Sequence, residues 1–177
     1  VLDSCPASIR EQLDGSLKRL RTDYIDLFYQ HRIDPKVEPE IVAQTMKELI
    51  AEGKIKYWGI SNAPVDYIRR AHTVCPVSAI EDQYSMVWRK PEQDLFPMCD
   101  ELDIGFMAYS PLGNGFLSGK VTQNTQYQEG DFRGQMRRFK PEVMAQNQVV
   151  LDLIAEIAER KNASSAQIVL AWELAQK

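Results

Sequence analysis

The chain has 177 residues, 44% of them hydrophobic and 26% charged, which is the composition of a globular protein and a length suited to one domain, residues 1–177. Its formal charge of −4 argues against a nucleic-acid-binding surface. The sequence holds neither a signal-peptide pattern nor an apolar run of the roughly 18 residues needed to cross a membrane. Cys5, Cys75 and Cys99 are odd in number and widely spaced, so we expect reduced thiols in the cytoplasm, with no disulfide framework and no metal site.

The first predicted element is a helix over residues 8–20. Apolar residues recur there at helical spacing, namely Ile9, Leu13, Leu17 and Leu20. Ser8 and Glu11 have the spacing of a capping box at the start of this helix. Residues 24–30 are rich in aromatic and β-branched side chains and are too few for a helix, so they predict a strand with His31 at its carboxyl end.

A second helix is predicted to open at Pro39 and to be closed by Gly53 as a C-terminal cap. Its inward residues would be Ile41, Met46, Leu49 and Ile50. Residues 54–60 form the second predicted strand, and Ser61 and Asn62 follow it.

The third predicted helix starts near Pro64 and ends before Pro76, because proline cannot continue a helix. A strand over residues 77–80 and a helix from Pro91 follow. The inward residues would be Ile68 and Ala71 in the third helix, and Leu95, Phe96, Cys99 and Leu102 in the fourth. Residues 104–109 are continuously apolar, so they predict a strand buried on both faces of a parallel sheet.

Residues 110–140 show no convincing period, and so long a stretch is uncommon unless it is functional, so we interpret it as a loop that covers a cofactor. A long helix is predicted over residues 141–161, with Asn162 as its cap, and a last helix starts at Ser165. The inward residues would be Val150, Leu153, Ile154 and Ile157 in the long helix, and Ile168, Val169 and Trp172 in the last.

Four strands that alternate with helices predict an α/β fold with a parallel sheet. Ligands of such sheets bind at the carboxyl ends of the strands. The candidate site therefore comprises the four segments at these ends, residues 30–32, 59–62, 81–84 and 109–113. They offer an imidazole, an amide with a hydroxyl, a second amide, and an aromatic face followed by a glycine-rich loop, which suit a nucleotide and a carbonyl compound.

Residues 110–120, called the glycine-rich loop below, read Ser-Pro-Leu-Gly-Asn-Gly-Phe-Leu-Ser-Gly-Lys. Glycines let backbone N–H groups approach an anion and Lys120 adds a positive charge, which together predict a phosphate-binding loop. An ordinary turn after a strand is the alternative for this stretch alone. Taken singly, His31 also fits a surface residue, and Ser61 with Asn62 also fits a helix start before Pro64.

Four motifs in this order resemble those of the aldo-keto reductases. They are Tyr-Gln-His-Arg at 29–32, Gly-Ile-Ser-Asn at 59–62, Asp-Gln-Tyr-Ser at 82–85, and Tyr-Ser-Pro-Leu-Gly-x-Gly-Phe-Leu-Ser-Gly-Lys at 109–120. The resemblance covers essentially the whole chain. It implies a (β/α)8 TIM barrel that binds NADPH without a Rossmann domain, of which this chain would be the middle to later half.

The resemblance also implies roles for individual residues. Ser61, Asn62 and Gln83 would hydrogen-bond the nicotinamide carboxamide and so fix which ring face points at the substrate. Tyr109 would stack on the nicotinamide ring. His31 would hydrogen-bond the substrate carbonyl, on whose oxygen negative charge grows as hydride reaches the carbon. The pyrophosphate would be held by Ser110, Pro111, Leu112, Gly113, Gly115 and Lys120, with Arg133 as a further candidate.

The implied activity is the NADPH-dependent reduction of aldehydes or ketones to alcohols. The catalytic tyrosine, lysine and aspartate of the family come from earlier βα units, so we expect this chain to be part of a longer protein and to be inactive alone. The substrate, the preference for NADPH over NADH and the oligomeric state stay open. Two alternatives are a regulatory subunit resembling the potassium-channel β subunits, which lack the histidine at His31, and an unrelated α/β barrel that binds a phosphorylated ligand.

Overall fold

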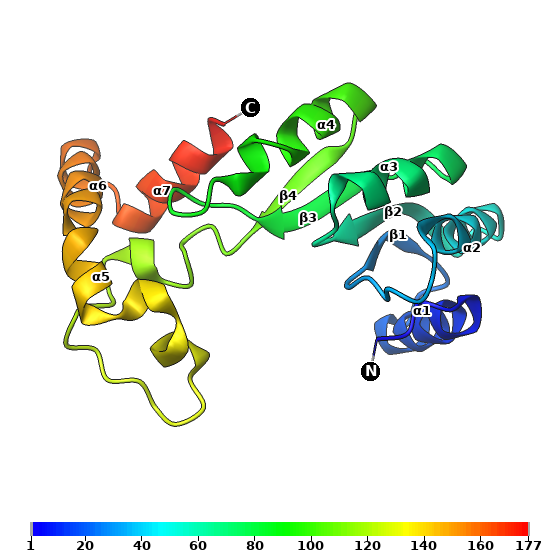
Figure 1. Cartoon of the computed structure of the whole chain (residues 1–177), viewed down its shortest axis with the longest axis horizontal. Helices are drawn as coiled ribbons and strands as arrows, with labels where there is room; N and C mark the ends of the chain where they lie inside the picture. Colours follow the sequence, from blue (N-terminus) through cyan, green and yellow to red (C-terminus); the bar gives the residue numbers. More distant parts are fainter. Residues whose placement is uncertain (1, 177) are drawn as a thin grey trace. The chain divides into compact units, whose positions relative to one another are not determined.

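The four strands form one sheet in the order in which they occur in the chain (Figure 1). The structure is a computed structural model that describes residues 2–176. The strands are β1 (Ile25–Gln30), β2 (Ile55–Ser61), β3 (Ala79–Gln83) and β4 (Gly105–Tyr109). β1 and β3 both pair parallel to β2, with Gln30 opposite Ile60 and Gly59 opposite Ala79. The carboxyl ends of these strands therefore meet at one edge, as the alternating pattern predicts.

Helices connect the strands and make up most of the chain after β4. They are α1 (Pro6–Leu20), α2 (Pro39–Ala51), α3 (Val65–Val74), η1 (Lys90–Glu92), α4 (Leu95–Leu102), η2 (Phe116–Ser118), η3 (Phe132–Gln135), η4 (Arg137–Phe139), α5 (Pro141–Gln146), α6 (Gln148–Lys161) and α7 (Ser165–Leu174), where η marks a 3₁₀ helix. Within residues 2–176, no helix has the length and apolar character that a membrane crossing requires.

The chain divides into two compact units. The first, here called the sheet unit, runs to Asp82 and also includes Lys90–Tyr109. The second, here called the loop unit, comprises Gln83–Arg89 and the chain from Ser110 onward. Each unit has a hydrophobic core of its own.

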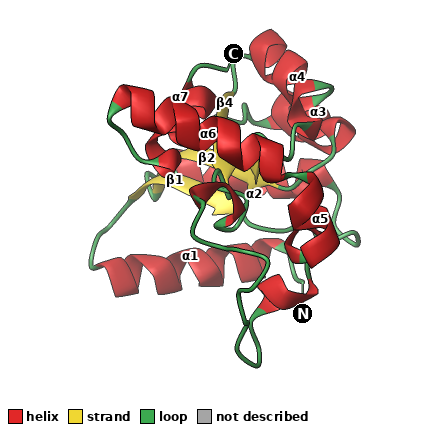
Figure 2. Cartoon of the chain, turned by 90° about the vertical axis from the view of Figure 1, so that its left-hand side faces the viewer, coloured by secondary structure: helices red, strands yellow, loops and turns green. Residues whose placement is uncertain are grey.

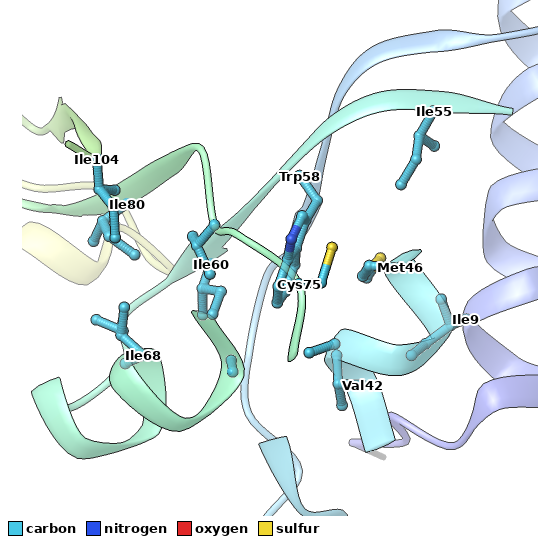
Figure 3. Packing of buried hydrophobic residues seen from close by; sticks show 14 of the residues in the cluster. Ile9, Val42, Met46, Ile55, Trp58, Ile60, Ile68, Cys75, Ile80 and Ile104 are labelled. Carbon is cyan, nitrogen blue, oxygen red and sulfur yellow. The ribbon is translucent and has the colours of Figure 1, made fainter. Parts of the chain in front are cut away.

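The core of the sheet unit lies between the sheet and its helices. Trp58 of β2 is fully buried there, and Figure 3 shows its indole beside Cys75 and Met46. The indole Nε1–H donates a hydrogen bond to the carbonyl oxygen of Pro76 at 3.0 Å, so the polar atom of this large side chain is buried with a partner. The same core includes Ile68, and Ile68 and Ala71 are inward in α3 as predicted.

The loop unit is built around short helices rather than a featureless loop. Phe116 of η2 and Phe139 of η4 pack edge to face, with ring centroids 6.1 Å apart, and Val169 of α7 is fully buried in the same core. Figure 2 shows α5, α6 and α7 as separate helices joined by loops. The prediction that residues 110–140 lack secondary structure is therefore wrong in part, because η2, η3 and η4 lie within them.

One predicted feature of the helix termini differs in the structure. The capping box at Ser8 is wrong, because α1 already begins at Pro6 and the Ser8 hydroxyl donates instead to an Asp3 carboxylate oxygen at 2.6 Å. A capping box does occur at the start of α7, between Ser164 and Gln167. Proline fits the first turn of a helix because the N–H it lacks has no intrahelical partner there.

The long helix predicted over residues 141–161 is two helices. The chain breaks at Asn147, whose side-chain amide donates to the Val143 carbonyl oxygen at 2.8 Å and so competes with the backbone of the helix. The core-facing stripe of α6 is Leu151, Ile154 and Ala158. Leu153, predicted to be inward, is 55% exposed.

The strands also differ in detail from the prediction. β3 continues through Glu81 and Asp82 to Gln83, residues that the sequence indicated only after the strand. β4 is an edge of the described sheet, and its Met107 is 48% exposed, so burial on both faces is wrong for this strand. Ile41 of α2, predicted to be inward, is 46% exposed because Val42, Met46 and Leu49 form the buried stripe.

Candidate functional site

The ring of Tyr29 in β1 packs against Gly59, near the carboxyl end of β2. A side chain at Gly59 would place its Cβ 2.4 Å from Tyr29 Cε1 and 2.7 Å from the carbonyl oxygen of Ala79. Glycine is therefore needed at this position for space, since no other residue leaves room for the ring. Ser61 lies two residues further along the same face of β2, because alternate residues of a strand share a face.

Three candidate residues are joined by hydrogen bonds at this edge of the sheet. The Tyr109 hydroxyl donates to Asn62 Oδ1 at 2.7 Å, and Asn62 Nδ2 donates to Ser61 Oγ at 2.6 Å. Asn62 has a positive φ of 54°, and its backbone N–H donates to the Glu81 carbonyl oxygen at 3.0 Å. Asparagine tolerates this left-handed conformation better than most residues, so the chain can turn sharply after β2 and aim the amide at Tyr109.

His31 follows β1 at the same edge. Its exposed side chain comes directly after Gln30, which pairs with Ile60 of β2, so His31 lies level with Ser61. Arg32 Nη1 donates to the His31 carbonyl oxygen at 2.8 Å and reaches Ser61 Oγ at 3.4 Å. The structure thus brings His31, Ser61, Asn62 and Tyr109 to one edge of the sheet, as the sequence predicts.

Negative charge beside the Tyr109 ring comes from the end of β3. Burial raises the pKa of the Tyr109 phenol, and the carboxylates of Asp82 and Glu81 raise it further, while Arg32 and the hydrogen bond with Asn62 act in the opposite direction. The phenol is therefore a neutral hydrogen-bond donor at ordinary pH. Gln83, the last residue of β3, is half-buried.

Backbone hydrogen bonds within the glycine-rich loop hold its conformation. The N–H of Gly113 donates to the Ser110 carbonyl oxygen at 2.9 Å, and the N–H groups of Gly115 and Leu117 donate to that of Leu112 at 3.1 and 3.0 Å. The N–H groups of the two glycines are thus used within the loop, unlike the expectation that they would approach an anion.

The remaining loop candidates have different surroundings. Leu112 packs against the core of the loop unit, and its neighbour Pro111 is half-buried. Lys120 is exposed and lines an open cavity of about 470 Å³, whose other walls include Asp152 of α6. Arg133 is held by an ion pair with Asp131 at 2.6 Å, the carboxylate two residues before it.

Sequence reasoning missed two arginines. Arg32 was considered only as the last residue of the motif at 29–32, and Arg138 was not considered for the site. Arg138 Nη1 is buried and lies 3.2 Å from the position that a Cβ at Gly113 would take. No residue of the described range 2–176 accepts a hydrogen bond from this nitrogen.

Each unit by itself supplies groups that suit one part of a nicotinamide dinucleotide. In the sheet unit, Asn62 and Ser61 supply the amide and hydroxyl groups that a planar carboxamide can bond, and Tyr109 supplies an aromatic face. Gln83 of the loop unit is a further amide. In the loop unit, the guanidinium of the half-buried Arg138 lies beside Gly113 and supplies a positive charge for an anionic group.

Comparison with known proteins identifies the family of this chain. The sequence pattern of the Aldo/keto reductase family matches residues 3–177. The structure superposes on that of a glycerol dehydrogenase from Gluconobacter oxydans with a TM-score of 0.95 and 28% sequence identity, covering 98% of this chain and 53% of that protein.

A second solved structure is similar over the same extent. It is a thermostable aldo-keto reductase in complex with the inhibitor epalrestat, with a TM-score of 0.72 and 28% identity, covering 97% of this chain and 53% of that protein. The chain thus spans about half the length of both relatives, and its parallel sheet with helices corresponds to about half of their TIM barrel, as predicted. The chain belongs to the aldo/keto reductase family.

Proposed function

We propose that the complete protein is an NADPH-dependent oxidoreductase that reduces aldehydes or ketones to alcohols. Membership of the aldo/keto reductase family supports an oxidoreductase with a nicotinamide cofactor and a small carbonyl substrate. The observation that carries the proposal is the hydrogen-bonded set of Tyr109, Asn62 and Ser61 beside His31 at the strand ends.

In this proposal the strand-end residues orient the nicotinamide. Asn62, Ser61 and Gln83 bond the carboxamide, and because each bond has a direction, together they select one ring face. The hydroxyl of Tyr109 is already bonded to Asn62, which fixes the ring and leaves its face for stacking. The glycine-rich loop, with Ser110, Pro111, Leu112, Gly113, Gly115 and Lys120, holds the pyrophosphate.

His31 acts on the substrate in this proposal. The bound nicotinamide supplies the hydride, and His31 donates a hydrogen bond to the carbonyl oxygen. That bond strengthens as charge develops on the oxygen, so it stabilises the transition state more than the ground state. The proton that completes the alcohol comes from the family's catalytic tyrosine, in a part of the protein outside this chain.

Titration of the complete protein with NADPH and with NADH, followed by nicotinamide fluorescence, tests the cofactor assignment. Tight binding of NADPH and weaker binding of NADH are expected. Cofactor oxidation with a panel of aldehydes and ketones then tests the reaction, and glycerol is the first alcohol to test in reverse because one similar structure is a glycerol dehydrogenase. Failure to bind either cofactor contradicts the proposal, and binding without turnover of any carbonyl favours the regulatory-subunit alternative.

A further inference from the structure

Arg138 is a cation packed against the glycine-rich loop. Its Nη1 atom lies 3.2 Å from the position of a Cβ at Gly113, on the same side as Val87 Cγ2, also at 3.2 Å. Gly113 has a φ of +58°, a backbone conformation that favours glycine, and a side chain at this position would also displace the end of Arg138 by a few tenths of an ångström. The guanidinium therefore occupies the space beside Gly113 that a side chain there would take.

Within the described residues 2–176, no carboxylate forms an ion pair with Arg138. Burial lowers the pKa of its guanidinium. Hydrogen bonds with Asp131, in contrast, raise the pKa of Arg133. An arginine remains protonated even when partly buried, so Arg138 carries a full positive charge. Among residues 2–176, none accepts a hydrogen bond from its buried Nη1.

A buried charge without a partner is unfavourable in a folded protein, so such a group is retained where an anion compensates it. The part of the molecule that Arg138 contacts is the glycine-rich loop, which also carries the Ser110 hydroxyl. Because Gly113 and Gly115 use their own N–H groups within the loop, the positive potential at this place comes from the side chain rather than from these amides.

We propose that Arg138 supplies the positive charge with which the glycine-rich loop binds the pyrophosphate of the cofactor. This inference rests on the proposed function, since it assigns a further residue to the same dinucleotide. It differs from the assignment of Arg133, whose guanidinium is bonded to Asp131.

The test compares three forms of the complete protein: the parent, Arg138→Met and Arg137→Met. Methionine has a similar apolar stem and no charge, and Arg137 is the exposed neighbour of Arg138, so the second variant is a matched control. Fluorescence titration should show that Arg138→Met weakens NADP⁺ and NAD⁺ binding by the same factor, about tenfold or more, as expected for a charge-assisted contact. Arg137→Met should change either dissociation constant by less than about twofold, because exposed charges are screened.

Thermal unfolding without cofactor distinguishes this role from a structural one. Removal of an uncompensated buried charge should leave the unfolding midpoint of Arg138→Met equal to or above that of the parent. Inorganic pyrophosphate should raise the midpoint of the parent and of Arg137→Met, and should not raise that of Arg138→Met.

Four outcomes would overturn the inference. If Arg138→Met keeps the parent's dissociation constants, Arg138 is not a ligand of the cofactor, while the proposed function stands. If only NADP⁺ binding weakens, the charge serves the 2′-phosphate rather than the pyrophosphate. A lower midpoint for the cofactor-free variant makes Arg138 a structural residue. If the parent binds neither dinucleotide, the proposed function and this inference both fail.

Discussion

At the scale of single residues, Tyr109 has both a hydroxyl that forms a hydrogen bond and an aromatic ring suited to stacking. Its hydroxyl holds the amide of Asn62, and its ring is the aromatic face at the end of β4. The hydroxyl and the ring can be separated by mutation, because phenylalanine keeps the ring and alanine keeps neither.

We predict that Tyr109→Ala raises the dissociation constant of the cofactor several-fold in the complete protein, because loss of an aromatic stack costs on the order of 1 kcal/mol. Tyr109→Phe, which loses only the hydrogen bond to Asn62, should raise it less. The measurement is fluorescence titration with NADPH. An unchanged constant for Tyr109→Ala would remove Tyr109 from the cofactor site, and equal effects of the two variants would assign the whole effect to the hydrogen bond.

His31 should affect the chemical step rather than cofactor binding. For His31→Ala we predict a fall in kcat on the order of a hundredfold, because removal of a donor to a developing oxyanion has effects of this size. Cofactor affinity should be unchanged. His31→Gln retains an N–H donor, so its kcat should lie between that of the parent and that of His31→Ala. Steady-state kinetics with a carbonyl substrate and NADPH provide the measurement, and a kcat for His31→Ala equal to that of the parent would rule out this role.

At the scale of elements, the helices of the sheet unit are linked by arginines on their outer surfaces. The ion pairs are Arg10 with Glu48 and Glu52 between α1 and α2, Arg70 with Glu38 and Glu40 between the start of α2 and α3, and Arg69 with Glu101 between α3 and α4. These side chains are largely exposed to solvent, so each pair contributes at most about 1 kcal/mol and is weakened by salt. The buried core around Trp58 therefore contributes more to the stability of this unit than the ion pairs do.

The contact between β1 and β2 depends on one glycine. Gly59→Ala would drive a Cβ into the Tyr29 ring and the Ala79 carbonyl, and the second of these is backbone that cannot rotate away. We predict a loss of about 1–3 kcal/mol in the free energy of unfolding, the usual cost of overpacking.

Gly53→Ala is the control for this prediction. Gly53 has a φ of +73° with no atom within 4 Å of a Cβ, so its substitution costs only backbone strain, about 1 kcal/mol. Chemical denaturation of the complete protein measures both variants. If Gly59→Ala is no more destabilising than Gly53→Ala, the close approach of Tyr29 to β2 is not a constraint on folding.

At the scale of the whole molecule, the four described strands have the features of an incomplete sheet. β1 and β4 are its edges, and Tyr57 and Met107 on its faces are 59% and 48% exposed. A closed barrel of this class has eight strands and roughly 250 residues. The chain covers 53% of each of two solved relatives, which agrees with a sheet of four strands.

We therefore predict that residues 1–177, expressed alone, neither reduce carbonyl compounds nor behave as a well-folded monomer. Open edge strands have unpaired N–H and C=O groups and promote aggregation. Sedimentation, thermal unfolding and NADPH oxidation by the isolated chain measure this. A monomer with a cooperative unfolding transition and reductase activity would contradict the prediction.

The sequence by itself determined the order of the four strands and of the main helices that alternate with them. Strands were predicted to begin at residues 24, 54, 77 and 104, and they begin at Ile25, Ile55, Ala79 and Gly105. Apolar periodicity, composition and prolines are local signals, so they locate elements without knowledge of what those elements pack against. The four motifs at the strand ends also indicated the family. Their residues could be expected to lie along one edge, because the carboxyl ends of parallel strands meet at the same edge of a sheet.

The tertiary structure alone decided which faces are buried and which groups meet. Ile41 and Met107 are apolar yet exposed, since burial depends on what packs against a face and not on the side chain. The break at Asn147 and the hydrogen bond of Tyr109 with Asn62 depend on side-chain directions that the apolar periodicity of the sequence does not show. Arg138 lies against Gly113 because the folding of the loop unit places two distant segments together, and this packing buries its Nη1 atom without an acceptor among residues 2–176.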